Sequence, residues 1–226
     1  ADRLEELMEQ SRREQENLKK SELRALQAQI NPHFLYNTLD SIVWMAEMNK
    51  TQDVVDMTMA LSNLFRSSIS DPNELVPLET ELKNIESYLT IQKYRYADKL
   101  NFQIDIPAAL YGCRVIKLML QPLVENALYH GIEKKRGGGT IRVCADVKDG
   151  CLVVQVADDG CGMTPEKLEE VQREVAGDLG QISEGGFGLP NIQKRIQLAY
   201  GADYGIHVSS RLGCGTRVTL QIPAKS

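Results

Sequence analysis

The sequence has 226 residues, of which 42% are hydrophobic and 25% are charged, a composition typical of a globular protein with a core of its own. A net charge of -5 argues against a nucleic-acid-binding surface, and no run approaches the roughly 18 consecutive apolar residues of a membrane span. The five cysteines form no CxxC pair, which argues against a disulfide framework or a zinc site and favours reduced thiols in a cytosolic compartment.

The chain divides into two halves of different composition. Residues 1–98 contain no glycine and show helical patterns, whereas residues 99–226 contain all 17 glycines and most of the alternating segments. We therefore predict a domain boundary at residues 98–101. The first residue is Ala1 rather than methionine and no signal peptide follows it, so we expect an excised segment, with any membrane anchor upstream.

Helical patterns dominate the first half. Residues 1–28 carry apolar residues every three or four positions, which predicts a coiled-coil signalling helix that needs a partner to bury its seam. Two further apolar stripes follow, formed by Val54, Met57, Leu61, Leu64 and Phe65 and by Leu78, Leu82, Ile85, Leu89 and Tyr96. Residues 71–73 signal a turn between them. Because a helical hairpin is too thin to hide its apolar faces, we predict a homodimer in which residues 29–98 form a four-helix bundle.

One of only three histidines lies inside this helical half. Residues 30–39 place His33 directly after Pro32, and a helix that crosses the proline should bend there. His33, Asn37 and Asp40 fall on one polar stripe, so the imidazole should face outward. The apolar stripe consists of Leu35, Leu39, Ile42 and Met45. Taken alone, the pattern equally fits an ordinary helix start, with Asn31 as N-cap and Pro32 at the first helical position.

The second half alternates between strand and helix patterns. The expected strands are residues 102–106, 140–147, 151–156, 206–208 and 217–222, and the expected helices are residues 115–130, 165–175 and 189–200. This order predicts a mixed sheet with helices on one face. His207 alternates within a strand, and we assign it no chemistry.

The predicted helix over residues 115–130 carries polar groups beside its buried stripe. Asn126 and His130 lie one turn apart there, with Glu125 and Tyr129 next to them. An amide oxygen suits Mg²⁺, and a histidine can donate to phosphate. For this helix alone, an ordinary exposed face explains the pattern better.

Two glycine-rich segments lie at the ends of predicted strands. Residues 158–162 follow a strand, so the glycines permit a sharp turn while the carboxylate of Asp158 can accept a hydrogen bond from an exocyclic amine such as that of adenine. The alternative is a simple Asp-Gly turn. Residues 213–216 lie between the last two strands and could form only a hairpin loop.

A third glycine-rich segment, residues 185–191, directly precedes a predicted helix. Its backbone amides and the helix N-terminus would face an anion. Each of these signals is weak alone.

Together and in this order, the patterns resemble bacterial sensor histidine kinases of the LytS/YesM type. The stretches that carry the resemblance are residues 29–37 (phosphoacceptor box), 76–93 (second dimerisation helix), 123–131 (N box), 158–162 (G1 box), 186–191 (G2 box) and 213–216 (last glycine box). The resemblance implies an α+β fold in which a dimerisation and histidine phosphotransfer domain, residues 29–98, precedes a catalytic ATP-binding domain, residues 99–226. The second domain would be a Bergerat-type α/β sandwich with a mixed sheet, as in gyrase and MutL.

The resemblance also implies roles for individual residues. His33 would be phosphorylated from ATP, Asn126 would bind Mg²⁺, and Asp158 would contact adenine. The other residues expected at the nucleotide are His130, Gly160, Gly162, Gly186, Gly188, Leu189, Asn191 and Thr216. Residues 164–185 would form a lid over ATP. The phosphoryl group would pass to an aspartate in the receiver domain of a response regulator, and the chain would be the cytoplasmic portion of a membrane sensor.

Two positions depart from the pattern of histidine kinases in general. Phe34 stands where many subfamilies place an acidic residue, although phenylalanine is usual in this one, so the base must come from elsewhere. Our hypothesis is that Glu125 accepts the imidazole proton, with Asp40 as the second candidate. Tyr129 stands where related sequences commonly carry lysine, which leaves phosphate charge to His130, to Arg195 or to the basic run 134–136.

Two other functions fit parts of the pattern. An ATPase of the same fold would use Glu125 to activate water, and a dimeric scaffold would bind nucleotide only as a structural ligand. The box around His33 argues against both, since neither function needs that histidine.

Overall fold

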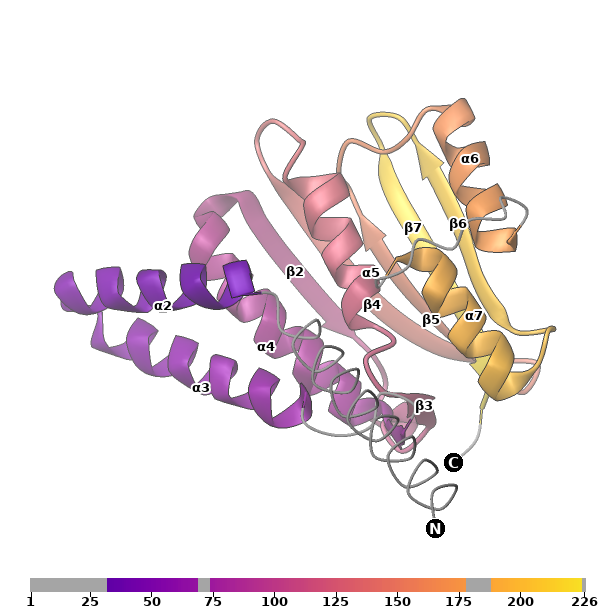
Figure 1. Ribbon diagram of the computed structural model, residues 1–226, viewed down its shortest axis with the longest axis horizontal. Coiled ribbons are helices and arrows are strands. Elements are labelled where there is room, and N and C mark those ends of the chain that lie inside the picture. The colour runs from indigo at the N-terminus through magenta and orange to yellow at the C-terminus, as the bar shows by residue number, and fades with distance from the viewer. Residues whose placement is uncertain (1–31, 69–73, 178–187, 225–226) are drawn as a thin grey trace, which may run out of the picture.

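The computed structural model describes residues 32–68, 74–177 and 188–224, and Figure 1 shows a group of helices beside a twisted sheet. The predicted coiled-coil helix, Asn31, the turn at residues 71–73, Gly186 and residues 178–185 of the predicted lid lie outside these ranges. Within the described residues, no helix has the length and apolar character needed to cross a membrane.

The described residues of the first half form three helices. They are α2 (Pro32–Glu47), α3 (Thr51–Ser68) and α4 (Leu78–Tyr96), and the apolar stripes read from the sequence pack as expected except at Leu39, which is 43% exposed. The turn between α2 and α3 closes at Asn49, whose φ of 57° lies in the left-handed region that asparagine tolerates well. The helix that carries His33 is therefore half of a hairpin.

Helix α4 packs on both sides. One side contacts α2 and α3, and the other contacts β2 and α5, so buried residues occur all around it. A single cluster of buried apolar side chains runs from the helices into the sheet. Because these contacts cross the expected boundary near residue 98, α4 mechanically joins the two parts of the chain. The domain limits themselves stay a prediction.

The main sheet has five strands in the order β2-β4-β5-β7-β6, with β2 and β4 parallel and every other pair antiparallel. Its strands are β2 (Leu100–Asp105), β4 (Gly139–Lys148), β5 (Cys151–Asp158), β6 (Gly205–Arg211) and β7 (Gly215–Pro223). A separate two-stranded sheet pairs β1 (Leu75–Pro77) with β3 (Arg114–Ile116). Alternate residues of β5 are buried, as a period-two strand with one covered face requires. The mixed sheet confirms the α+β prediction.

The second group of helices covers one face of the sheet (Figure 1). It comprises α5 (Gln121–Asn126), which continues as the π-helix η3 (Ala127–Ile132), then α6 (Pro165–Ala176) and α7 (Leu189–Tyr200). Two short 3-10 turns, η1 (Ala97–Lys99) and η2 (Ala108–Leu110), complete the described elements. Local signals explain α6 well, because Thr164 caps its N-terminus and Gly177 ends it in a left-handed conformation.

The predicted helix over residues 115–130 is wrong at its start. Residues 114–116 form β3, and the helix begins only at Gln121. Pro122 occupies its first turn, where a backbone N–H would have no partner within the helix, so a proline removes no helical hydrogen bond there. The segment between strand and helix turns sharply at Leu118, which has a φ of 55°, and the buried carboxylate of Glu81 binds the backbone N–H groups there.

Candidate functional site

The carboxylate of Asp158 lies nearly enclosed at the end of β5. Only 9% of the residue is exposed, and its Oδ1 accepts a hydrogen bond from the Gly160 N–H at 2.7 Å. Two glycines make this enclosure possible, since a Cβ on Gly131 would lie 2.6 Å from the Asp158 Cγ and one on Gly160 would meet the backbone of Gly131. Burial raises the pKa of Asp158, and backbone hydrogen bonds from Gly160 and Thr216 oppose that rise. The result is a buried acceptor packed closely against two glycines.

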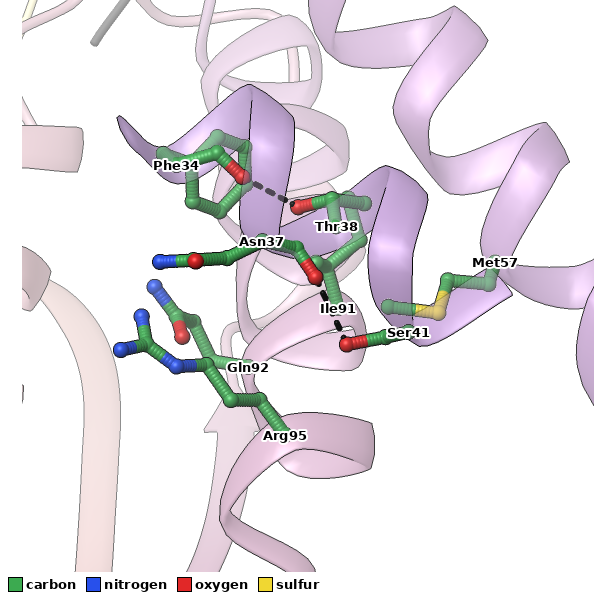
Figure 2. A pocket seen from close by; sticks show the side chains of 8 residues that line it. All are labelled: Phe34, Asn37, Thr38, Ser41, Met57, Ile91, Gln92 and Arg95. Atoms are coloured by element: carbon green, nitrogen blue, oxygen red, sulfur yellow. Dashed lines mark hydrogen bonds between the residues drawn. The ribbon is translucent and has the colours of Figure 1, made fainter. Parts of the chain in front are cut away.

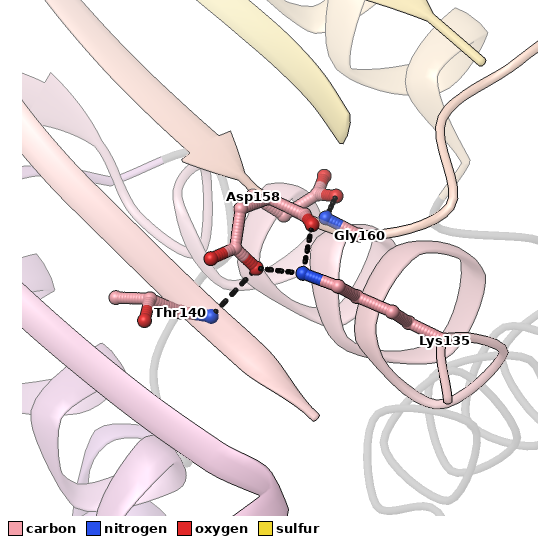
Figure 3. A network of polar contacts seen from close by, with 5 residues as sticks. Lys135, Thr140, Asp158 and Gly160 are labelled. Atoms are coloured by element: carbon pink, nitrogen blue, oxygen red, sulfur yellow. Dashed lines mark hydrogen bonds and ion pairs between the residues drawn. The ribbon is translucent and has the colours of Figure 1, made fainter. Parts of the chain in front are cut away.

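The next carboxylate, Asp159, serves a structural purpose (Figure 3). It accepts the Thr140 N–H at 2.9 Å and the Lys135 ammonium at 3.2 Å, and Lys135 also donates to the Asp159 carbonyl at 2.6 Å. These bonds attach the loop after η3 to the loop after β5. Lys135 belongs to the basic run suggested for phosphate, but here it binds the protein itself.

The π-helix η3 brings the N-box residues to the same loop. The Cys161 thiol donates to the carbonyl of His130 at 3.1 Å, and the Cys161 N–H donates to the carbonyl of Gly131 at 3.2 Å. Burial and the positive charge of Lys134 lower the pKa of His130, which favours a neutral imidazole at pH 7. Asn126 lies at the junction of α5 and η3, half-buried.

The last glycine box supports the loop from the other side. Gly215 has a φ of 96°, and a Cβ there would meet the Asp158 carbonyl oxygen. Gly162, with a φ of 65°, approaches the backbone of Arg211 equally closely. The Thr216 hydroxyl lies 2.9 Å from that of Ser210. Both glycines are therefore required by close backbone contact. Thr216 pairs with Asp158 across β5 and β7, and its contact with nucleotide stays a prediction.

No side chain among the described residues caps the N-terminus of helix α7. Gly188 occupies the N-cap position, half-buried Leu189 and Pro190 begin the helix, and the Asn191 N–H bonds the Gly188 carbonyl at 3.0 Å. Uncapped amides at a helix start suit an anion. Arg195, suggested above for phosphate, instead donates to backbone carbonyls of residues 117 and 118 at 2.7 and 3.4 Å.

His33 lies near the start of α2 with its side chain exposed, as predicted. The Asn37 amide nitrogen is 3.2 Å from both ring nitrogens. Behind the histidine, the ring of Phe34 stacks on that of Tyr88 of α4 at 5.6 Å between centroids. Figure 2 shows that Asn37 of α2 and Gln92 of α4 both line the small pocket between these helices.

Polar contacts extend from α4 to the N box. The Gln92 amide nitrogen donates to the Tyr88 hydroxyl at 2.9 Å and to the Tyr129 hydroxyl at 3.2 Å. Its Oε1 is buried and has no hydrogen-bond partner among the described residues. Tyr129, the departure from the usual lysine, therefore binds α4 rather than replacing a phosphate-binding cation.

Glu125 is mostly buried on α5, where the Gln121 amide donates to its carboxylate at 2.9 Å. Burial raises its pKa, and the bond from Gln121 opposes the rise. Its charge also helps to raise the pKa of Tyr88, so it lies on the side of α5 that faces α4. Asp40, the second candidate base, is about 10 Å along the helix axis from His33, beyond hydrogen-bond reach within one chain.

One buried charged residue, Glu81 of α4, was not identified from the sequence. It lies on the buried stripe between Leu78 and Leu82, so an acidic residue at an apolar position was the signal that could have identified it.

Comparisons with known proteins agree with this geometry. Residues 21–100 match the family described as histidine kinase, and residues 114–226 match the family described as histidine kinase-, DNA gyrase B-, and HSP90-like ATPase. Sensor histidine kinase YesM of Bacillus subtilis (strain 168) is 38% identical over 99% of this chain and 37% of its own length.

Two further relatives are similar over most of this chain. Sensor histidine kinase YpdA of Escherichia coli (strain K12) is 35% identical over 96% of this chain and 37% of its own length. Sensor protein LytS of Bacillus subtilis (strain 168) is 33% identical over 91% of this chain and 34% of its own length. The chain spans little more than a third of these relatives. With both family matches in the predicted order, the chain belongs to the sensor histidine kinase family.

Proposed function

We propose that the chain transfers the γ-phosphoryl group of ATP to a ring nitrogen of His33 and then to an aspartate of a response-regulator receiver domain. The observation that carries this proposal is the buried Asp158 carboxylate packed against glycines, in a part of the chain that α4 joins to the helix presenting His33. Phosphoryl transfer depends mainly on positioning and charge stabilisation, which such a site can supply.

The polar groups around Asp158 and at the start of α7 suit a nucleotide. The Asp158 carboxylate would accept the adenine amine, and the uncapped start of α7 at Gly188, Leu189 and Asn191 would face phosphate oxygens. Gly186 belongs to the same proposed contact. The neutral His130 would donate a hydrogen bond to phosphate without adding a full charge.

The donor set also fits Mg²⁺ shared with the nucleotide. Among the described residues, no cluster of three or more His, Cys, Asp or Glu side chains could hold a metal. In the proposed site, the ion would be held by the amide oxygen of Asn126 together with phosphate oxygens and water. When bound, Mg²⁺ neutralises part of the phosphate charge.

Glu125 would handle the proton of His33. The nucleophile is a neutral imidazole, and the reaction releases its remaining ring proton, so a base near the acceptor helps. Burial keeps the pKa of Glu125 above its usual range, which makes this carboxylate a better proton acceptor than an exposed one. Its position on the α4 side of α5 directs it towards the helices that present His33.

The active form would be a homodimer. α2 and α3 expose apolar side chains that one chain leaves uncovered: Tyr36, Leu39, Val43, Trp44, Met48, Val55 and Met59. Leu39, expected on the core-facing stripe, belongs to this exposed face instead. Two copies that join these faces would form the predicted four-helix bundle.

The receiver domain would dock beside His33, which is exposed on the same helices. We also propose that the chain is the cytoplasmic portion of a longer membrane sensor, since its relatives are nearly three times its length.

Labelling with γ-labelled ATP tests the proposal. We expect acid-labile, base-stable label on the wild-type chain and none on His33→Gln, with thermal unfolding unchanged because the side chain is exposed. Release of free phosphate without protein label would indicate the ATPase alternative, and ATP binding with neither product would indicate the scaffold.

A further inference from the structure

Glu81 is an acidic side chain buried in the interface between α4 and the ATP-binding part of the chain. Only 1% of the residue is exposed. Its Oε1 accepts the Leu118 N–H at 2.7 Å, and its Oε2 accepts those of Met119 and Leu120 at 2.9 and 3.1 Å. Three consecutive backbone donors converge on one carboxylate.

The same short segment is held from the opposite side by α7. The Arg195 guanidinium donates to the carbonyls of Lys117 and Leu118 at 2.7 and 3.4 Å, and its charge also acts on Glu81. Residues 117–120 are thus bound through their N–H groups by α4 and through their carbonyls by α7. We name Glu81, Arg195 and residues 117–120 the α4 clamp.

The clamp lies directly behind the proposed nucleotide site. Residues 117–120 lead into α5, which ends at Asn126, the proposed Mg²⁺ ligand. Arg195 lies in α7, whose uncapped N-terminus is the proposed phosphate contact. One carboxylate of α4 therefore binds the segment that leads into α5, and α7 is bound to the same segment through Arg195.

We propose that Glu81 is a positioning residue for ATP, which sets the relation of Asn126 to the start of α7. This inference rests on the proposed function. It also gives α4 a direct physical route to the nucleotide site, because any shift of α4 relative to the sheet moves the carboxylate to which the segment before α5 is bound. Such a contact is a discrete element through which the helices could alter ATP affinity.

The test compares Glu81→Gln with Glu79→Gln in the full chain. The glutamine keeps the size of the side chain but turns an NH₂ group towards backbone donors, so at least one N–H loses its acceptor. Glu79 is the matched control, since it lies on the same helix and pairs only with Lys83 near the surface. We expect Glu81→Gln to raise the KM for ATP about tenfold, with a smaller change in kcat. Glu81→Asp should recover part of the loss, because it restores the charge and both acceptor oxygens.

Arg195→Gln provides an independent variant. If both side chains act on one segment, the combined variant raises the KM by less than the product of the two single effects. Should Glu81→Gln fail to fold, Arg195→Lys tests the same clamp by removing the second donor group while keeping the charge.

Two results would overturn the inference. One is a KM for ATP that is the same in Glu81→Gln and Glu79→Gln while Glu81→Gln melts at a lower temperature, which assigns Glu81 to stability alone. The other is fully multiplicative effects of Glu81→Gln and Arg195→Gln. Equilibrium binding of a fluorescent ATP analogue gives the same comparison between variants without turnover. A wild-type chain that binds nucleotide but leaves His33 unmodified would refute the proposed function, and the binding comparison would still test the role of Glu81.

Discussion

At the scale of single residues, the proposed nucleotide site depends on glycines as much as on larger side chains. Asp158 lies against Gly131 and Gly160 so closely that neither position has room for a methyl group. Burial raises the pKa of this carboxylate and excludes a competing shell of water, so in the proposed site it would accept the adenine amine. Specificity for adenine would follow from this enclosure.

Gly131→Ala tests that enclosure. Its Cβ would press on the Asp158 carboxylate and displace it, and overpacking of this kind typically costs about 1–3 kcal/mol. We expect ATP affinity, measured by calorimetry, to fall at least about tenfold, since a shift of 1.4 kcal/mol is tenfold in an equilibrium constant. Gly112→Ala is the control, because nothing lies within 4 Å of a Cβ there. Equal affinity in the two variants would contradict the assigned pocket.

Glu125 should leave its signature in the pH dependence of autophosphorylation. Burial raises its pKa above the ordinary value of 4.5, and only the ionised form accepts a proton. The rate should therefore rise with pH through that raised pKa and be lost as pH falls below it.

Glu125→Gln should abolish this limb of the profile and slow the reaction severely, whereas Glu86→Gln, an exposed change on α4, should leave both intact. A wild-type rate in Glu125→Gln, with ATP binding retained, would reject the role of base.

At the scale of elements, the α2–α3 hairpin has an apolar face that its own chain leaves exposed. Val43 lies at the middle of this face and is 58% exposed. In a dimer it would be buried against the partner copy, as the proposed four-helix bundle requires.

Val43→Glu should therefore convert the dimer to a monomer, because a carboxylate without a partner is costly to bury in an apolar interface. Light scattering measures the change, and Val147→Glu, at an exposed position of β4, supplies the control. A wild-type chain that is monomeric, or a Val43→Glu chain that stays dimeric, would contradict this face as the interface.

Elements also differ in how far the sequence alone predicts them. α6 and α7 lie within a residue of their expected limits, because Thr164, Pro165 and Gly177 carry local start and stop signals. The segment before α5 was predicted wrongly because its conformation depends on Glu81, nearly 40 positions away along the chain. Pro122 was a visible local signal for the later start.

The π-helix also depends on contacts with residues far away along the chain. No local pattern marks residues 127–132 as wider than an α-helix, yet the carbonyls of His130 and Gly131 are held by Cys161 on a distant loop. Tertiary contacts of this kind set the geometry of the N box. Residue types at a site can be predicted from sequence, but such distances between them cannot.

At the scale of the whole molecule, α4 connects the helix that carries His33 with the N box. On one side, Tyr88 stacks on Phe34, the neighbour of the proposed phosphoacceptor. On the other side, Gln92 bonds Tyr129 of the N box, and Glu81 holds the segment before α5. The helix that carries His33 and the proposed nucleotide site are thus fastened to one helix.

The most direct measurement is the position of the phosphoryl group after incubation of the chain with ATP and Mg²⁺. Digestion at neutral or alkaline pH followed by mass spectrometry separates the peptides that contain His33, His130 and His207. We expect a phosphoryl group on the His33 peptide and on neither of the others. Modification of another histidine, or an unmodified His33 peptide from a chain that binds ATP, would contradict it.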